Sequence, residues 1–219
     1  MHFIRSVCIL LLLLSTPVLA KSYQLAVFGD SLAAGYNLSQ EDSFYARLED
    51  MLQNALYDVT IINASRSGRT TAGGLAAQAA LIQQKPDAVI LELGINDTLR
   101  NLDIEAISKN LDQLITRFKE NDIPVLLVGM KTLPDKDPAY QVQFEQMYRD
   151  LAAKHELLLY PFFMEGVFGT DENGNITFDN LLPDQIHPNK RGVQIMVDYI
   201  LPSVIEFLNY NRFPKISTQ

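Results

Sequence analysis

The chain has 219 residues, of which 47% are hydrophobic and 20% charged, and this composition suits a folded domain with a sizeable core. The formal net charge of −8 and the lack of a basic stripe disfavour nucleic acid and anionic membrane surfaces as partners. Cys8 is the only cysteine, so a small fold held together by disulfides is excluded.

The first twenty residues are typical of a secretory signal peptide. Arg5 gives a positive start, residues 7–14 are apolar, and Val18-Leu-Ala20 supplies small residues before a cleavage site. The alternative is an uncleaved membrane anchor, but the apolar stretch is well short of the roughly 20 residues that span a bilayer. Cys8 lies inside that stretch, not at a lipoprotein attachment point.

We therefore expect cleavage after Ala20, which removes Arg5 and takes the formal net charge from −8 to −9. Residues 21–219 then form a single domain without a stable membrane anchor. The expected location is the bacterial periplasm or the extracellular medium, and the expected oligomeric state is a monomer.

Strands and helices are predicted to alternate along the rest of the chain. Apolar runs predict buried parallel strands at 25–28, 59–62, 88–91, 125–128 and 157–160. Helical periodicity covers 43–56, 74–83, 104–119, 139–154 and about 189–209. This alternation predicts a three-layer α/β/α fold whose five-stranded parallel sheet has the flavodoxin-like order 2-1-3-4-5.

Three polar turns that contain glycine follow the strands expected to be neighbours in that order. They are residues 65–68 after the second strand, 29–31 after the first and 94–97 after the third. Ligands in such sheets bind beyond the carboxyl ends of the strands, where the strand order reverses. The fold is therefore expected to bring the three turns to one place.

The connection 161–184 is unusually long and has little helical pattern. We expect it to carry the following residues, Asp184 and His187, back above Ser31. Its apolar side chains can either line an acyl groove or pack the loop onto the sheet, and packing is the favoured alternative. They are Phe162, Phe163, Met164, Val167, Phe168, Leu181 and Leu182.

Ser31 follows the first predicted strand in Phe28-Gly-Asp-Ser-Leu. A serine hydroxyl is a poor nucleophile unless a base takes its proton and a carboxylate orients that base. Outside the signal peptide the bases available are His155, which suits the end of a helix, and His187, which follows Asp184 by three residues. That spacing lets Asp184 accept from Nδ1–H of His187 and leaves Nε2 for the serine, although Asp184 alone could equally cap the last helix.

Acyl transfer also needs donors for the developing oxyanion. Ser31 offers its backbone N–H, Gly68 an unobstructed N–H and Asn96 a side-chain amide. Taken singly, Gly68 would more simply be a turn glycine, and Asn96 a turn or capping residue. The combination of all these segments at one end of one sheet favours the catalytic interpretation.

The chain resembles the GDSL-type, or SGNH, hydrolases, and within them the branch of small periplasmic thioesterases, lysophospholipases and arylesterases. The motifs that carry this resemblance are Phe28-Gly-Asp-Ser-Leu, Asn63-Ala-Ser-Arg-Ser-Gly68, Gly94-Ile-Asn96-Asp97 and Asp184-Gln-Ile-His-Pro188. The resemblance implies that Ser31 is the nucleophile and that Asp184 and His187 complete a triad. It further implies that Gly68 and Asn96 complete the oxyanion hole, and that no metal or cofactor is needed. Asp30 and Asp97 are expected to fix their own turns through backbone hydrogen bonds.

Three residues depart from the family pattern. Arg69 stands where an aspartate is common, and Ile95 and Thr98 replace glycines around Asn96-Asp97. Ile95 and Thr98 are expected to stiffen a substrate-binding loop and narrow the substrate range. Arg69 is expected to place a cation near the substrate.

These observations predict a serine esterase that hydrolyses a lysophospholipid, aryl ester or thioester through an acyl-enzyme. The alternatives are a carbohydrate O-acetyl esterase and a non-catalytic binding module with the same fold. Metalloprotease, P-loop and dinucleotide-binding motifs are absent from the sequence, as is the Gly-x-Ser-x-Gly elbow.

Overall fold

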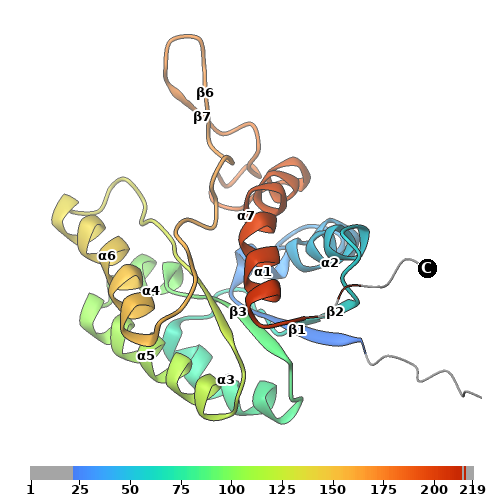
Figure 1. Cartoon of the computed structure of the whole chain (residues 1–219). Helices are drawn as coiled ribbons and strands as arrows, with labels where there is room; N and C mark the ends of the chain where they lie inside the picture. Colours follow the sequence, from blue (N-terminus) through green and yellow to red (C-terminus); the bar gives the residue numbers. More distant parts are fainter. Residues whose placement is uncertain (1–21, 214, 216–219) are drawn as a thin grey trace, which may run out of the picture.

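A five-stranded parallel sheet forms the centre of the protein (Figure 1). The computed structural model describes residues 22–213 and 215. The predicted signal peptide lies outside these residues. The strand order is β2-β1-β3-β4-β5, which confirms the predicted topology. The strands are β1 (Tyr23–Phe28), β2 (Val59–Asn63), β3 (Ala88–Glu92), β4 (Val125–Val128) and β5 (Leu159–Tyr160).

Helices cover both faces of this sheet (Figure 1). On one side α2 (Phe44–Asn54) packs against α7 (Lys190–Tyr210). On the other side α5 (Ile104–Glu120) lies between α3 (Thr71–Gln83) and α6 (Pro138–His155). All five of these helices were predicted, within a few residues at each end.

Side-chain caps explain where several of the helices begin. Ser43 accepts a hydrogen bond from the N–H of Ala46 at the start of α2, and Asn189 accepts from the N–H groups of Arg191 and Gly192 at the start of α7. Such caps satisfy backbone donors that have no partner inside the helix.

The core lies between the sheet and its two helical layers. Residues 25–28 of β1 and 88–91 of β3 are almost completely buried, as expected for central strands covered on both faces. The apolar face predicted for α5 is fully buried as well; it consists of Ile107, Leu111, Leu114 and Phe118. This continuous core holds the carboxyl ends of β1, β2 and β3 at fixed positions.

Two short α-helices were not predicted, and both begin where a central strand ends. They are α1 (Ser31–Ala34), after β1, and α4 (Ile95–Leu99), after β3. Neither is long enough to show helical periodicity in the sequence. Strand β5 is shorter than predicted because the N–H of Leu157 bonds to the carbonyl of Ala152 at the end of α6.

The connection 161–184 contains a hairpin of β6 (Gly169–Thr170) and β7 (Ile176–Thr177), which stands out from the body of the protein (Figure 1). Most of its predicted apolar residues pack inward, since Phe163, Met164, Val167 and Leu181 are buried. Phe168 remains exposed. Most of the apolar side chains of this segment therefore pack against the body of the protein and do not line an open groove.

None of the helices in the described part of the chain combines the length and the apolar character that crossing a membrane requires.

Candidate active site

Ser31 is the first residue of α1, immediately after the turn that ends β1. Asp30 caps this short helix, because its Oδ1 accepts the N–H of Leu32 at 3.0 Å. Gly35 ends the helix with a φ of 78°, a conformation that glycine adopts at little cost. The hydroxyl of Ser31 is thus held at the carboxyl edge of the sheet, with the residue 9% exposed.

A chain of hydrogen bonds joins Ser31 to His187 and Asp184. The distance from Ser31 Oγ to His187 Nε2 is 2.9 Å, and that from His187 Nδ1 to Asp184 Oδ2 is 2.8 Å. The second carboxylate oxygen, Oδ1, accepts the N–H groups of Ile186 and His187 at 3.0 Å each. The structure therefore brings together the three residues that the sequence predicted, across the whole length of the chain.

Asp184 is held in its ionised form. Partial burial alone would raise the pKa of this carboxyl, but hydrogen bonds from the N–H groups of His187 and Ile186 and from the imidazole hold the pKa below its ordinary value. An ionised Asp184 favours the His187 tautomer with its proton on Nδ1, which leaves Nε2 free to accept from Ser31.

Tyr36 packs against the imidazole of His187, with ring centroids 4.3 Å apart. No role was predicted for Tyr36, which lies five positions after Ser31 and just past the end of α1. The two rings are inclined by 32°, so Tyr36 covers part of the imidazole. The feature of the sequence that could have indicated this contact is an aromatic residue shortly after Ser31.

The predicted oxyanion donors occupy the two neighbouring turns. Gly68 has a φ of 75°, and a Cβ at this position would meet no atom within 4 Å. Glycine is therefore favoured here by backbone conformation and not by crowding, and the space beside it is open. Asn96, in α4, donates from Nδ2 to Asp30 Oδ2 at 2.9 Å, which leaves the second hydrogen of the amide for another acceptor.

Hydrogen bonds join the three turns into one unit. The N–H of Gly29 donates to Ser65 Oγ at 3.1 Å, and the N–H of Arg66 donates to the carbonyl of Gly29 at 3.1 Å. Arg100 extends from the end of α4 to the carbonyl of Gly68 at 3.1 Å. The relative positions of Ser31, Gly68 and Asn96 are thus fixed by contacts around the site.

Asp97 fixes a different turn from the one expected. Its carboxylate accepts the N–H of Thr71 at 2.9 Å and the hydroxyl of Thr71 at 2.6 Å, so it ties α4 to the first turn of α3. Asp30 does cap its own turn, as expected, but its second oxygen also receives the Asn96 amide.

A second buried carboxyl, Glu92, lies at the end of β3 next to Asp30. Its Oε2 accepts the backbone N–H of Asp30 at 3.2 Å, and the residue is 1% exposed. Burial raises the pKa of Asp30 to about 7 and that of Glu92 well above its ordinary value, and the nearby charge of Asp30 raises the pKa of Glu92 further. Glu92 belongs to none of the sequence motifs, and its charged side chain at the end of an apolar strand is the feature by which it could have been predicted.

The three residues that depart from the family pattern make contacts within the protein. Thr98 is fully buried and donates from Oγ1 to the carbonyl of Ile95 at 2.8 Å, while Ile95 is 7% exposed. The guanidinium of Arg69 lies 4.6 Å from the centre of the Phe28 ring and donates to the carbonyls of Gly29 and Ala64. Burial lowers the pKa of the Arg69 guanidinium.

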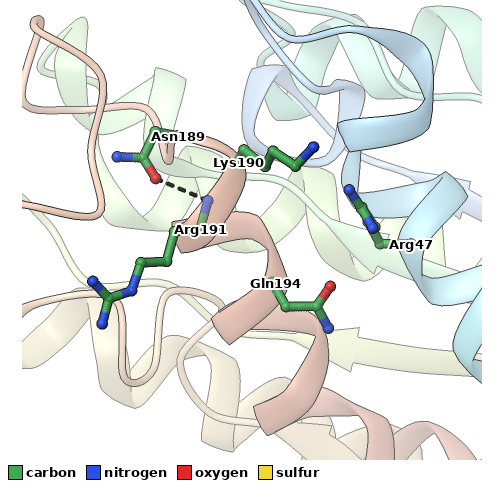
Figure 2. Close-up of a pocket in the computed structure, with 5 residues that line it drawn as sticks. All are labelled: Arg47, Asn189, Lys190, Arg191 and Gln194. Carbon is green, nitrogen blue, oxygen red and sulfur yellow. Dashed lines mark hydrogen bonds between the residues drawn. The ribbon is translucent and has the colours of Figure 1, made fainter.

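A hollow of about 510 Å³ lies beside the start of α7, next to the segment that carries His187 (Figure 2). Its lining includes three cations, but Figure 2 shows Arg191 directed away from Lys190 and Arg47. Asp42 pairs with Lys190 at 3.0 Å and also with Arg47. The positive charge is therefore dispersed and partly neutralised, so the hollow does not form a converging anion site.

Within the described ranges, no group of three or more His, Cys, Asp and Glu side chains is arranged to hold a metal ion. His155 ends α6 and pairs with Asp112 at 2.6 Å, away from Ser31.

Comparison with known proteins gives consistent matches. The model of the GDSL-like lipase/acylhydrolase family matches residues 27–195. An arylesterase of Vibrio mimicus is 34% identical over 85% of this chain and 90% of its own length. The thioesterase 1/protease 1/lysophospholipase L1 of Escherichia coli K12 is 31% identical over 92% of this chain and 93% of its own length.

The fold has a close counterpart among solved structures. The crystal structure of TesA superposes with a TM-score of 0.78 and 33% sequence identity, and the match covers 84% of this chain and 99% of that chain. With the fold, the hydrogen-bonded chain from Asp184 to Ser31 and these matches together, the protein is a carboxylic ester hydrolase that belongs to the GDSL-like lipase/acylhydrolase family.

Proposed function

We propose that the protein is a serine esterase that hydrolyses acyl esters through an acyl-enzyme, with Ser31, His187 and Asp184 as its catalytic triad. The observation that carries this proposal is the unbroken hydrogen-bonded chain from Asp184 Oδ2 through the imidazole to Ser31 Oγ, at 2.8 and 2.9 Å. Such an arrangement supplies a nucleophile, a base and a group that orients the base.

In the first half of the reaction, His187 Nε2 takes the proton of Ser31 as Oγ attacks the carbonyl carbon of the ester. Negative charge then develops on the carbonyl oxygen, where the N–H groups of Ser31 and Gly68 and the free hydrogen of the Asn96 amide stabilise it. His187 returns the proton to the leaving group as the tetrahedral intermediate collapses.

In the second half, His187 takes a proton from water, which attacks the acyl-enzyme. Collapse of the second intermediate releases the acid and returns the proton to Ser31. Asp184 stays ionised throughout and stabilises the imidazolium that forms twice in each turnover.

The proposed substrates are lysophospholipids and aryl or short acyl esters, with thioesters accepted by the same oxyanion chemistry. The names of two relatives, arylesterase and thioesterase/lysophospholipase, support this range. A signal peptide at residues 1–20, as proposed, would direct the protein to a compartment that contains phospholipid esters, whereas coenzyme A esters are cytoplasmic and polyanionic. The negative charge of the chain opposes the approach of polyanions.

The test is hydrolysis of p-nitrophenyl esters from acetyl to palmitoyl by residues 21–219, with Ser31→Ala in parallel. We expect the activity to fall to background in Ser31→Ala and to persist in Ser39→Ala, an exposed serine that bonds to Asp42. Retained activity in Ser31→Ala would refute the triad. A strict preference for acetyl esters, with acetylated glycans hydrolysed faster than lysophospholipid, would instead identify a carbohydrate deacetylase.

A further inference from the structure

Glu92 is the polar end of an otherwise apolar strand. The other four residues of β3 are fully buried hydrophobic side chains, and Glu92 is itself only 1% exposed. Oε2 accepts the backbone N–H of Asp30 at 3.2 Å, whereas Oε1 is buried and receives no hydrogen bond from any described residue. A carboxyl in such a place is costly to ionise, so its presence calls for a role beyond packing.

The turn after β1 is built to admit this carboxyl. A Cβ at Gly29 would lie 2.6 Å from Glu92 Oε2 and 3.0 Å from the Glu92 carbonyl oxygen. Only a residue without a side chain lets the peptide before Ser31 approach Glu92 this closely. The close packing of Glu92 against this turn therefore depends on the glycine of the Gly-Asp-Ser-Leu motif.

Asp30 connects that contact to the oxyanion hole. Its backbone N–H donates to Glu92, and its side chain accepts Leu32 N–H through Oδ1 and Asn96 Nδ2 through Oδ2, at 3.0 and 2.9 Å. The amide nitrogen of Asn96 carries two hydrogens, so the bond to Asp30 also sets the direction of the second hydrogen.

The surroundings of the two carboxyls favour ionisation of Asp30 over ionisation of Glu92. Asp30 has two side-chain hydrogen bonds and the nearby charge of Arg69 in its favour, whereas Asp97 opposes its ionisation. Glu92 has one donor, and Tyr148 of α6, which lies close to both carboxyls, stays neutral because its pKa is raised well above its ordinary value. These differences favour ionisation of Asp30 before Glu92, so Glu92 is the carboxyl that stays neutral to the higher pH.

We propose that Glu92 is a positioning residue for the oxyanion hole: as a neutral acid it holds the backbone of Asp30, and through Asp30 it orients the amide of Asn96. This inference rests on the proposed function, because it assigns a task within the same site. Glu92 touches neither substrate nor nucleophile in this scheme.

Two substitutions separate positioning from packing. Glu92→Leu keeps the approximate side-chain volume but removes the acceptor for Asp30 N–H. We expect kcat to fall roughly 10- to 100-fold, with KM within about twofold of wild type. Complete loss of one oxyanion donor typically lowers kcat by about 10²–10³-fold, and a misdirected donor should cost less. Glu92→Gln keeps a neutral acceptor and should restore most of kcat. Glu49 is the matched control, because its carboxylate accepts the backbone N–H of Ile61 on β2. Glu49→Leu should lower stability without lowering kcat.

A spectroscopic measurement tests the same inference without turnover. The side-chain amide signal of Asn96 in ¹⁵N-labelled protein should titrate near pH 7 as Asp30 ionises, since the pKa of Asp30 is raised to about 7. The titration should persist in Glu92→Gln and be displaced or broadened in Glu92→Leu. It remains measurable in wild type and Glu92→Gln even if Glu92→Leu fails to fold.

Three results would overturn the inference. They are an Asn96 amide that does not titrate between pH 5 and 9, a folded Glu92→Leu with wild-type kcat, and a titration midpoint that drops clearly in Glu92→Gln, which would show that Glu92 is charged. Retained activity in Ser31→Ala would overturn the proposed function instead, and the Asn96 titration would still decide the present question.

Discussion

Asp184 uses both oxygens to place His187. Oδ2 bonds to the imidazole, while Oδ1 accepts two backbone N–H groups and fixes the loop itself. The carboxylate side chain is nevertheless 36% exposed, so water can replace part of its electrostatic effect.

For Asp184→Asn we expect kcat to fall by about 10²-fold, less than the roughly 10⁴-fold loss that a buried triad aspartate produces. The amide would still accept the backbone N–H groups but would favour the wrong imidazole tautomer. Steady-state kinetics on a short p-nitrophenyl ester measure this, with Asp179→Asn as a nearby control. A loss of less than threefold would mean that the backbone, and not the carboxylate, orients His187.

Ile95 lies directly before Asn96 and is expected to stiffen the segment around it. It lies in the first turn of α4, is 7% exposed and bonds through its carbonyl to Thr98. Ile95→Gly should broaden the range of acyl lengths hydrolysed, because a glycine loop can move with the substrate. The profile from acetyl to palmitoyl esters measures this, with the exposed Leu99→Ala as control. An unchanged profile would remove Ile95 from the determinants of specificity.

At the scale of elements, the β6–β7 hairpin stands out from the body of the protein (Figure 1). Ile176 is 60% exposed, and the hydrogen bonds of Asp171 are made to Asn173 and Asn175 of the same turn. Replacing residues 170–176 with Gly-Gly should therefore change the free energy of unfolding by no more than about 1 kcal/mol.

Thermal unfolding and short-ester kinetics measure the effect of that replacement, and both should remain near wild type. A drop in melting temperature of more than about 5 °C, or a loss of acetyl-ester activity, would show that the hairpin supports the segment carrying Asp184 and His187.

The main elements could be predicted because each leaves a pattern in the sequence. Long apolar runs marked the central strands, and the four motifs predicted that Ser31, Gly68, Asn96 and His187 meet at the carboxyl edge of the sheet, although Ser31 and Asn96 lie in short helices and not in turns. Helices α1 and α4 are too short to show periodicity, and the hairpin has strands of two residues each. The inward orientation of Arg69 and the pairing of Asp30 with Glu92 depend on contacts between turns that are far apart in the chain, and a single sequence does not reveal such contacts.

For the whole molecule, the buried carboxyls determine how stability depends on pH. The pKa of Asp30 is raised from 3.8 to about 7 in the folded protein, so between about pH 4 and 7 the folded state binds more protons than the unfolded state. The free energy of unfolding must then fall as the pH rises through this window, by about 1.4 kcal/mol per pH unit for each extra proton. Glu92 acts in the same direction, since its pKa is raised too.

We expect the protein to be more stable at pH 5 than at pH 8, by about 3 kcal/mol from Asp30 alone. The lowered pKa of Asp184 has the opposite effect, and its contribution is lost only as the pH falls below about 4. Urea unfolding at a series of pH values measures the dependence, and Asp30→Asn should flatten it. Stability that rises from pH 5 to 8 in the wild type would contradict the assignment of raised pKa values to this pair.

The position of His187 near the end of the chain bears on when the site is completed as the chain folds. The nucleophile and its oxyanion donors belong to the first half of the sequence, whereas the base comes on the loop just before α7. Helix α7 begins just after His187 and packs against α2, so this packing helps to hold the loop in place. If the proposed triad is correct, we expect a chain to gain esterase activity only after its last helix has folded.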